Sequence, residues 1–166
     1  ALADLVSQGA LSFVLDIRDN PVVYPTQAVD MASLFLKSGS FVQIETKVGK
    51  RVKFATGNVA TDKPLVVLVN ENTAAASEML AAALQENLRA TLVGASTLGK
   101  GSVQVVRDLS FGGALRYTAA YYLTPQGRTI NDVGVTPDVS VGLGGEDGSD
   151  HQRRLALENA QSIARE

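Results

Sequence analysis

The chain of 166 residues contains no cysteine, no tryptophan and a single histidine, His151. Without cysteine it forms no disulfide and offers no thiolate for a metal ion or for nucleophilic catalysis. One histidine excludes a multi-histidine metal centre and leaves His151 as the only candidate base for a Ser-His-Asp triad. The net charge of -2 provides no basic excess for binding nucleic acid. No apolar run approaches the ~20 residues needed to span a bilayer.

Apolar segments with the character of strands alternate along the chain with segments of helical character. Residues 65–69 are apolar on both sides, which is typical of a strand covered on both faces of a sheet. A helix is predicted from 74 to about 88, and a further strand at 91–93 is followed by a glycine-rich loop at 94–101. This alternation predicts an α/β fold with a mostly parallel or mixed sheet flanked by helices.

The C-terminal part of the chain differs in composition from the rest. Residues 142–150 are rich in glycine and aspartate, and a helix is predicted from His151 to about Ala164. We therefore expect residues 1–141 to form the core domain and residues 142–166 to form a linker and a C-terminal helix that packs on it. The N-terminus lacks an initiator methionine and a signal-like region, as in a fragment or a mature form.

The loop from Gly94 to Gly101 approximates a phosphate-binding P-loop without meeting its requirements. Gly101 stands where the P-loop places a serine or threonine for magnesium, and Ser102 comes one position late. The next residues are β-branched, whereas a P-loop opens a helix. Magnesium-dependent ATP binding by this loop is therefore a minor alternative.

Other candidate groups have simpler interpretations. His151 lies in the predicted first turn of the C-terminal helix, where a solvated side chain is expected. The carboxylates of Glu146, Asp147 and Asp150 do not follow the spacing of a calcium-binding EF-hand loop.

Two segments combine features that favour acyl-transfer chemistry. Residues 70–78 form a turn from a buried strand into a helix, where free backbone amides and the helix dipole can stabilise an oxyanion. Residues 98–104 place Lys100 among glycines, and a desolvated amine can act as a base at neutral pH. If the following strand is regular from Lys100, Gln104 lies on the same face and can orient the amine.

These segments resemble the C-terminal processing peptidases, or tail-specific proteases, which use a Ser-Lys dyad. The resemblance implies an α/β, crotonase/Clp-protease-like core with a mixed sheet flanked by helices. It extends over almost the whole chain, through residues 14–21, 27–35, 65–78, 99–104, 121–128 and 134–138.

The resemblance also assigns roles to individual positions. The family's turn reads Asn-x-x-Ser-Ala-Ser-Ala-Ser-Glu, and its middle serine, the nucleophile, corresponds here to Ala75. Lys100 corresponds to the general base and Gln104 to the residue that orients it. The two oxyanion donors correspond to the backbone amides of Ala76 and Val22.

Ala75 and the loop before Val22 depart from the family pattern. Ala75 has no hydroxyl, so either it was introduced to trap an inactive protease or the chain is a naturally inactive relative. Val22 and Val23 replace two glycines of the family's oxyanion loop, which favours natural divergence or an unusual variant. Ser77 is a weak substitute for the nucleophile, because two residues of helix turn a side chain by ~200°.

The resemblance implies a serine-type endopeptidase core that processes the C-terminal region of protein substrates and is inactive as written. The alternative is a naturally non-catalytic peptide-binding or scaffolding relative of the same fold.

No metal or organic cofactor and no nucleic acid is implied, and the partners are the C-termini of proteins or peptides. A homo-oligomer is compatible with this interpretation. The family's PDZ domain is missing from this chain, which we expect to be truncated at its N-terminus. Relatives imply an extracytoplasmic location: periplasm, cell envelope or thylakoid lumen.

Overall fold

The computed structural model describes residues 2–21, 24–142 and 150–165. The helices in these ranges are α1 (Leu2–Ser7), α2 (Pro25–Ser33), α3 (Ala76–Glu86) and α4 (His151–Ile163). The strands are β1 (Phe13–Asp16), β2 (Ser40–Thr46), β3 (Gly49–Phe54), β4 (Leu65–Val69), β5 (Thr91–Gly94), β6 (Ser102–Asp108), β7 (Ala114–Leu123) and β8 (Val139–Ser140). No helix in the described part is long and apolar enough to cross a membrane.

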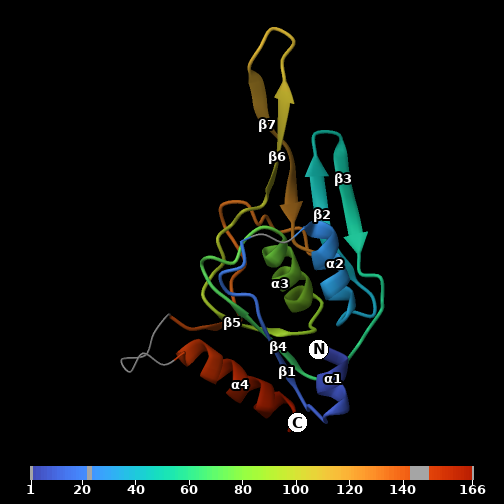
Figure 1. Cartoon of the computed structure of the whole chain (residues 1–166), viewed down its shortest axis with the longest axis vertical. Coiled ribbons are helices and arrows are strands. Elements are labelled where there is room, and N and C mark those ends of the chain that lie inside the picture. Colours follow the sequence, from blue (N-terminus) through green and yellow to red (C-terminus); the bar gives the residue numbers. More distant parts are fainter. Residues whose placement is uncertain (1, 22–23, 143–149, 166) are drawn as a thin grey trace.

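A parallel sheet with strand order β1-β4-β5-β8 forms the centre of the fold. Helix α4 lies on one side of this sheet, and α2 and α3 lie on the other (Figure 1). Successive residues of β4 point to opposite faces: Val67 and Val69 join the apolar cluster with α2 and α3, whereas Val66 and Leu68 join the cluster with α4. The prediction that residues 65–69 form a strand covered on both faces is confirmed.

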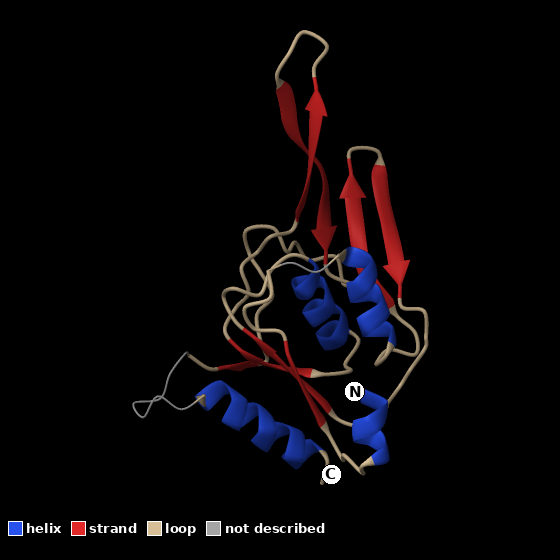
Figure 2. Cartoon of the chain, viewed as in Figure 1, coloured by secondary structure: helices blue, strands red, loops and turns tan. Residues whose placement is uncertain are grey.

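An antiparallel sheet with strand order β3-β2-β7-β6 forms the second layer. Its two hairpins, β2–β3 and β6–β7, extend beyond the helices (Figure 2). The base of this sheet packs on the main core through Phe41 and Val42, which are almost fully buried. The predicted α/β class with flanking helices is confirmed, and its mixed character comes from one parallel and one antiparallel sheet.

The parallel arrangement places the carboxyl ends of β1, β4 and β5 at one edge of the sheet. Each of these strands is followed by one of the segments that the sequence marks for chemistry. The loop after β1 contains Asn20, the loop after β4 leads to Ala75, and the loop after β5 contains Lys100. The topology therefore brings residues far apart in sequence to one place.

Candidate active site

The three loops at the carboxyl edge of the parallel sheet are joined by backbone hydrogen bonds. The amide of Ala74 donates to the carbonyl of Asn20 at 3.2 Å, and the amide of Leu98 donates to the carbonyl of Thr73 at 3.0 Å. The turn before α3 is thus held from both sides. This arrangement fixes where α3 begins relative to the loop of Lys100.

Ala75 adopts a backbone conformation that side-chain-bearing residues rarely occupy. Its φ is 55° and its ψ is -119°, immediately before the first residue of α3. A non-glycine residue in such a region costs about 1–3 kcal/mol, and strain of this kind concentrates at functional sites. A sharp strand-to-helix turn also exposes the nucleophile in α/β-hydrolases. The strained turn lies at the position that the resemblance assigns to the nucleophile.

Glu78 connects Ala75 to the loop of Lys100. Its carboxylate is fully buried, and one oxygen, Oε2, accepts hydrogen bonds from the amides of Ala75 at 2.9 Å and Lys100 at 2.8 Å. The other oxygen, Oε1, accepts from the amide of Gly99 at 2.7 Å and from the hydroxyl of Thr97. Four donors therefore satisfy the carboxylate. Because two of them share one oxygen, the backbones at positions 75 and 100 lie within two hydrogen-bond lengths of each other.

The amide of Ala76 is free to bind an oxyanion. As the first residue of α3 it has no partner within the helix, and no other described residue accepts a hydrogen bond from it. The N-terminal end of the helix dipole adds a partial positive charge there. Val22, the second predicted donor, lies outside the described residues, as does Val23.

Lys100 lies beside the turn through its backbone, but its side chain is exposed. No other described residue forms a hydrogen bond or an ion pair with its amine. Gln104 does not orient this amine here: its amide donates to the hydroxyls of Ser102 at 3.3 Å and Thr118 at 2.7 Å. A register shift between Val103 and Gln104 interrupts the regular alternation that placed Gln104 on the face of Lys100. The sequence predicts a desolvated amine, whereas the Lys100 side chain is exposed to solvent in this structure.

Gly101 allows the loop of Lys100 to lie directly against a neighbouring loop. A Cβ added there would come within 2.4 Å of the backbone nitrogen of Asn131. We expect Gly101→Ala to lower the free energy of unfolding by about 1–3 kcal/mol, because one loop must shift. Gly142→Ala is the matched control, since a Cβ at Gly142 meets nothing within 4 Å. Urea unfolding of both variants measures the difference, and equal stabilities would contradict this explanation.

The other candidates that the structure describes do not join the site. Ser77 is buried, and its hydroxyl has no partner among the described residues. His151 lies in the first turn of α4, as predicted, with its ring next to the Arg154 guanidinium at 2.7 Å. The loop at 94–101 runs into β6 rather than a helix, so it lacks the structural context of a P-loop. Glu146 and Asp147 lie outside the described residues.

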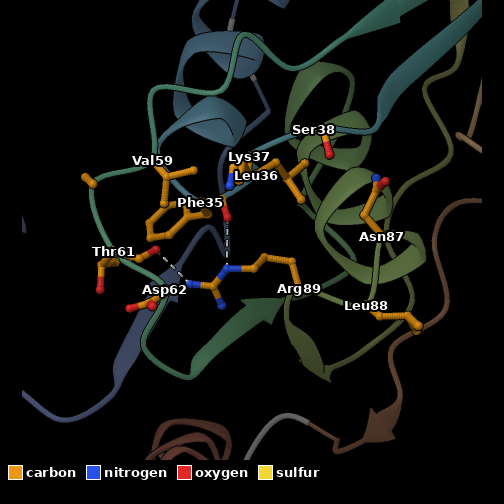
Figure 3. A pocket seen from close by; sticks show the side chains of 11 residues that line it. Phe35, Leu36, Lys37, Ser38, Val59, Thr61, Asp62, Asn87, Leu88 and Arg89 are labelled. Carbon is orange, nitrogen blue, oxygen red and sulfur yellow. Dashed lines mark hydrogen bonds between the residues drawn. The ribbon is translucent and has the colours of Figure 1, made fainter.

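A pocket of about 640 Å³ lies at the C-terminal end of α3, where Asn87, Leu88 and Arg89 line it (Figure 3). Arg89 extends into it and donates to the backbone carbonyls of Phe35 at 2.9 Å, Thr61 at 3.1 Å and Lys63 at 2.8 Å. Burial lowers the pKa of this guanidinium. Arg89 therefore links the segments of Phe35 and of Thr61–Lys63 to the C-terminal end of α3, and it takes no part in the site around Ala75.

The role of Glu78 was not identified from the sequence. The available signal is its position three residues after Ala75, because a glutamate at this spacing can accept from the backbone amide of the helix N-cap. Thr97, which donates to the same carboxylate, gave no signal in the sequence.

Known proteins resemble this chain across the region that carries the site. The model of peptidase family S41 matches residues 1–141. A carboxyl-terminal-processing protease of a Synechocystis species is 47% identical over 139 residues, which cover 83% of this chain and 33% of that protein. A carboxy-terminal processing protease of Bacillus subtilis is 39% identical over 145 residues, which cover 86% of this chain and 31% of that protein.

A solved structure shows the same similarity in three dimensions. The photosystem II D1 C-terminal processing protease matches with a TM-score of 0.80 at 42% identity, over 86% of this chain and 37% of that one. The chain thus spans about a third of the length of these relatives. The match of the family model to residues 1–141 and the identity to these relatives confirm the resemblance read from the sequence. The chain belongs to peptidase family S41, a family of serine peptidases that includes C-terminal processing proteases.

Proposed function

We propose that this chain is the core of a serine endopeptidase that processes the C-terminal region of protein substrates with a Ser-Lys dyad, and that Ala75 makes it inactive as written. The observation that carries the proposal is the Glu78 carboxylate, which binds the backbone amides of positions 75 and 100 with one oxygen. The strained turn at Ala75 and the free amide of Ala76 support it.

The geometry supports a direct mechanism once a serine occupies position 75. The amine of Lys100 accepts the hydroxyl proton while the oxygen attacks the carbonyl carbon of the scissile peptide bond. The amides of Ala76 and Val22 donate to the oxyanion of the tetrahedral intermediate. Lys100 then gives its proton to the departing amine. A water molecule, deprotonated by Lys100, hydrolyses the acyl-enzyme and restores the serine.

The exposed amine of Lys100 becomes an effective base when a peptide covers it. A bound substrate excludes water from the amine and places the scissile peptide bond beside it. In this proposal Gln104 exchanges its present partners, Ser102 and Thr118, for the amine when substrate binds. Substrate binding therefore completes the catalytic arrangement.

A naturally non-catalytic, peptide-binding relative is the second candidate, and the methyl side chain of Ala75 favours it. Such a protein would keep the turn and the free amide of Ala76 as a binding site for a peptide carbonyl. The two functions are separated by peptide hydrolysis with an Ala75→Ser variant. The enzyme core gains activity, whereas a binding protein continues to bind peptides without cleaving them.

The remaining parts of the proposal rest on the family and, for residues 142–166, on the sequence composition. Residues 1–141 form the protease core, and residues 142–166 form the linker and the helix that packs on it. The substrates are the C-termini of proteins or peptides, with a homo-oligomer as a compatible assembly and a location outside the cytoplasm. No metal or organic cofactor takes part in the proposed chemistry.

A further inference from the structure

Arg18 lies between the C-terminal helix and the loops of the site. Its side chain is 16% exposed, and it forms paired hydrogen bonds with two carboxylates. Nε and Nη2 donate to the two oxygens of Asp16 at 2.9 and 2.7 Å. Nη1 and Nη2 donate to the two oxygens of Asp150 at 2.7 and 2.6 Å. Such bidentate pairs fix orientation as well as distance.

The start of α4 is built around this guanidinium. Asp150 is the N-cap of the helix, and its carboxylate also accepts from the amide of Arg153 at 2.9 Å. The Arg18 guanidinium, with a smaller effect of the Arg153 amide, lowers the pKa of Asp150 to about 2. Gln152 is 1% exposed, accepts from Arg18 at 3.2 Å and donates to the carbonyl of Val141 at 2.9 Å.

Arg18 is followed in sequence by Asp19 and Asn20, and this segment forms hydrogen bonds with the residues before Ala75. Asp19 follows with a φ of 54°, and its amide donates to Asn70 Oδ1 at 3.0 Å. The carboxylate of Asp19 accepts from the side-chain amides of Asn72 at 2.8 Å and Asn70 at 2.9 Å, and these hydrogen bonds lower its pKa. The carbonyl of Asn20 then accepts from the amide of Ala74.

A continuous series of hydrogen bonds and backbone links therefore runs from α4 through Arg18 to the residue before Ala75. We propose that Asp150 and Gln152 are positioning residues, which hold Arg18 and the Asp19–Asn20 segment so that the turn at Ala75 keeps its reactive geometry. This inference rests on the proposed function. It assigns a role in the site to residues that lie beyond the segment matched by the family model, 1–141.

The test compares Asp150→Asn with Glu45→Gln. Asparagine remains a good helix N-cap, so Asp150→Asn removes the ion pair while keeping the cap. Asp150→Ser, another good cap, checks that the effect follows the lost carboxylate. Glu45→Gln is the matched control, because it removes the exposed ion pair with Lys50 on the β2–β3 hairpin.

Hydrogen exchange at the backbone amides of Asp19 and Ala74 is the first measurement, and it needs no enzymatic activity. We expect both Asp150 variants to accelerate exchange at these amides by about tenfold or more, with Glu45→Gln unchanged. Unchanged exchange in the Asp150 variants overturns the inference, whatever the activity.

Peptide hydrolysis in an Ala75→Ser background is the second measurement. We expect Asp150→Asn to lower kcat by about tenfold to a hundredfold with little change in KM, because a displaced turn weakens transition-state binding. Equal kcat in an active background overturns the inference and leaves the proposed function standing. An inactive Ala75→Ser chain contradicts the proposed function, and the exchange rates then decide the positioning role alone.

Discussion

An Ala75→Ser variant is expected to cleave peptides at a rate at least about 10³-fold above that of the chain as written. The backbone at position 75 already has φ 55° and ψ -119°, so the substitution adds one oxygen to a preformed turn. The Glu78 carboxylate fixes that turn against the loop of Lys100, and the amide of Ala76 is free for the oxyanion. A new nucleophile beside a base and an oxyanion donor supplies the elements of acyl transfer.

Mass spectrometry of casein incubated with the variant identifies the cleaved bonds. The kcat is then measured on a peptide that contains one of these bonds. Ser77→Ala in the active background is the matched control, because this buried hydroxyl has no place in the mechanism. We expect it to leave the acquired activity in place. A folded Ala75→Ser variant that binds peptides but cleaves none would contradict the enzyme core and favour the peptide-binding relative.

Replacing Glu78 by glutamine is expected to destabilise the protein and disrupt the site together. The amide NH2 group of glutamine cannot accept, so two of the four donors now bonded to the carboxylate lose their partner. Leaving buried donors unsatisfied costs about 2–4 kcal/mol in all, which lowers the melting temperature by about 5–15 °C. In an Ala75→Ser background kcat falls by about 10²-fold or more, because positions 75 and 100 are no longer fixed together.

Glu71→Gln is the matched control for this prediction. Glu71 is an exposed carboxylate in the same strand-to-helix turn, and no described residue donates a hydrogen bond to it. Its substitution is expected to change the free energy of unfolding by about 0.5 kcal/mol or less. Calorimetry on both variants makes the comparison. Equal melting temperatures for Glu78→Gln and the unsubstituted chain would show that the buried carboxylate does not hold the two loops.

The parts of the fold that depend on local pattern could be predicted from the sequence. The apolar run at 65–69 indicated a strand buried on both faces because every residue in it is hydrophobic, and β4 has that environment. The sequence predicts the start of α3 two residues too early, at 74, because alanine has high helix propensity. The helix begins at Ala76, since the strained φ of Ala75 cannot be part of a helix.

The parts of the site that depend on long-range contacts could not be predicted from the sequence. Glu78 bonds to Thr97 and Lys100, which only the parallel sheet brings near, and Arg18 meets Asp150 from the far end of the chain. The expected alignment of Gln104 with Lys100 assumed a regular strand, and the register shift at Gln104 removes that assumption. Tertiary contacts therefore decide which polar residues in this chain act together.

The Ser-Lys pairing is tested directly by the rate at which a fluorophosphonate labels the serine of an Ala75→Ser variant. This rate is compared between a variant that keeps Lys100 and one in which methionine replaces it. Methionine keeps the length of the side chain and removes the amine. We expect Lys100→Met to slow labelling at position 75 by about 10²-fold to 10⁴-fold, the usual contribution of a general base. Equal labelling rates in the two proteins would contradict the pairing.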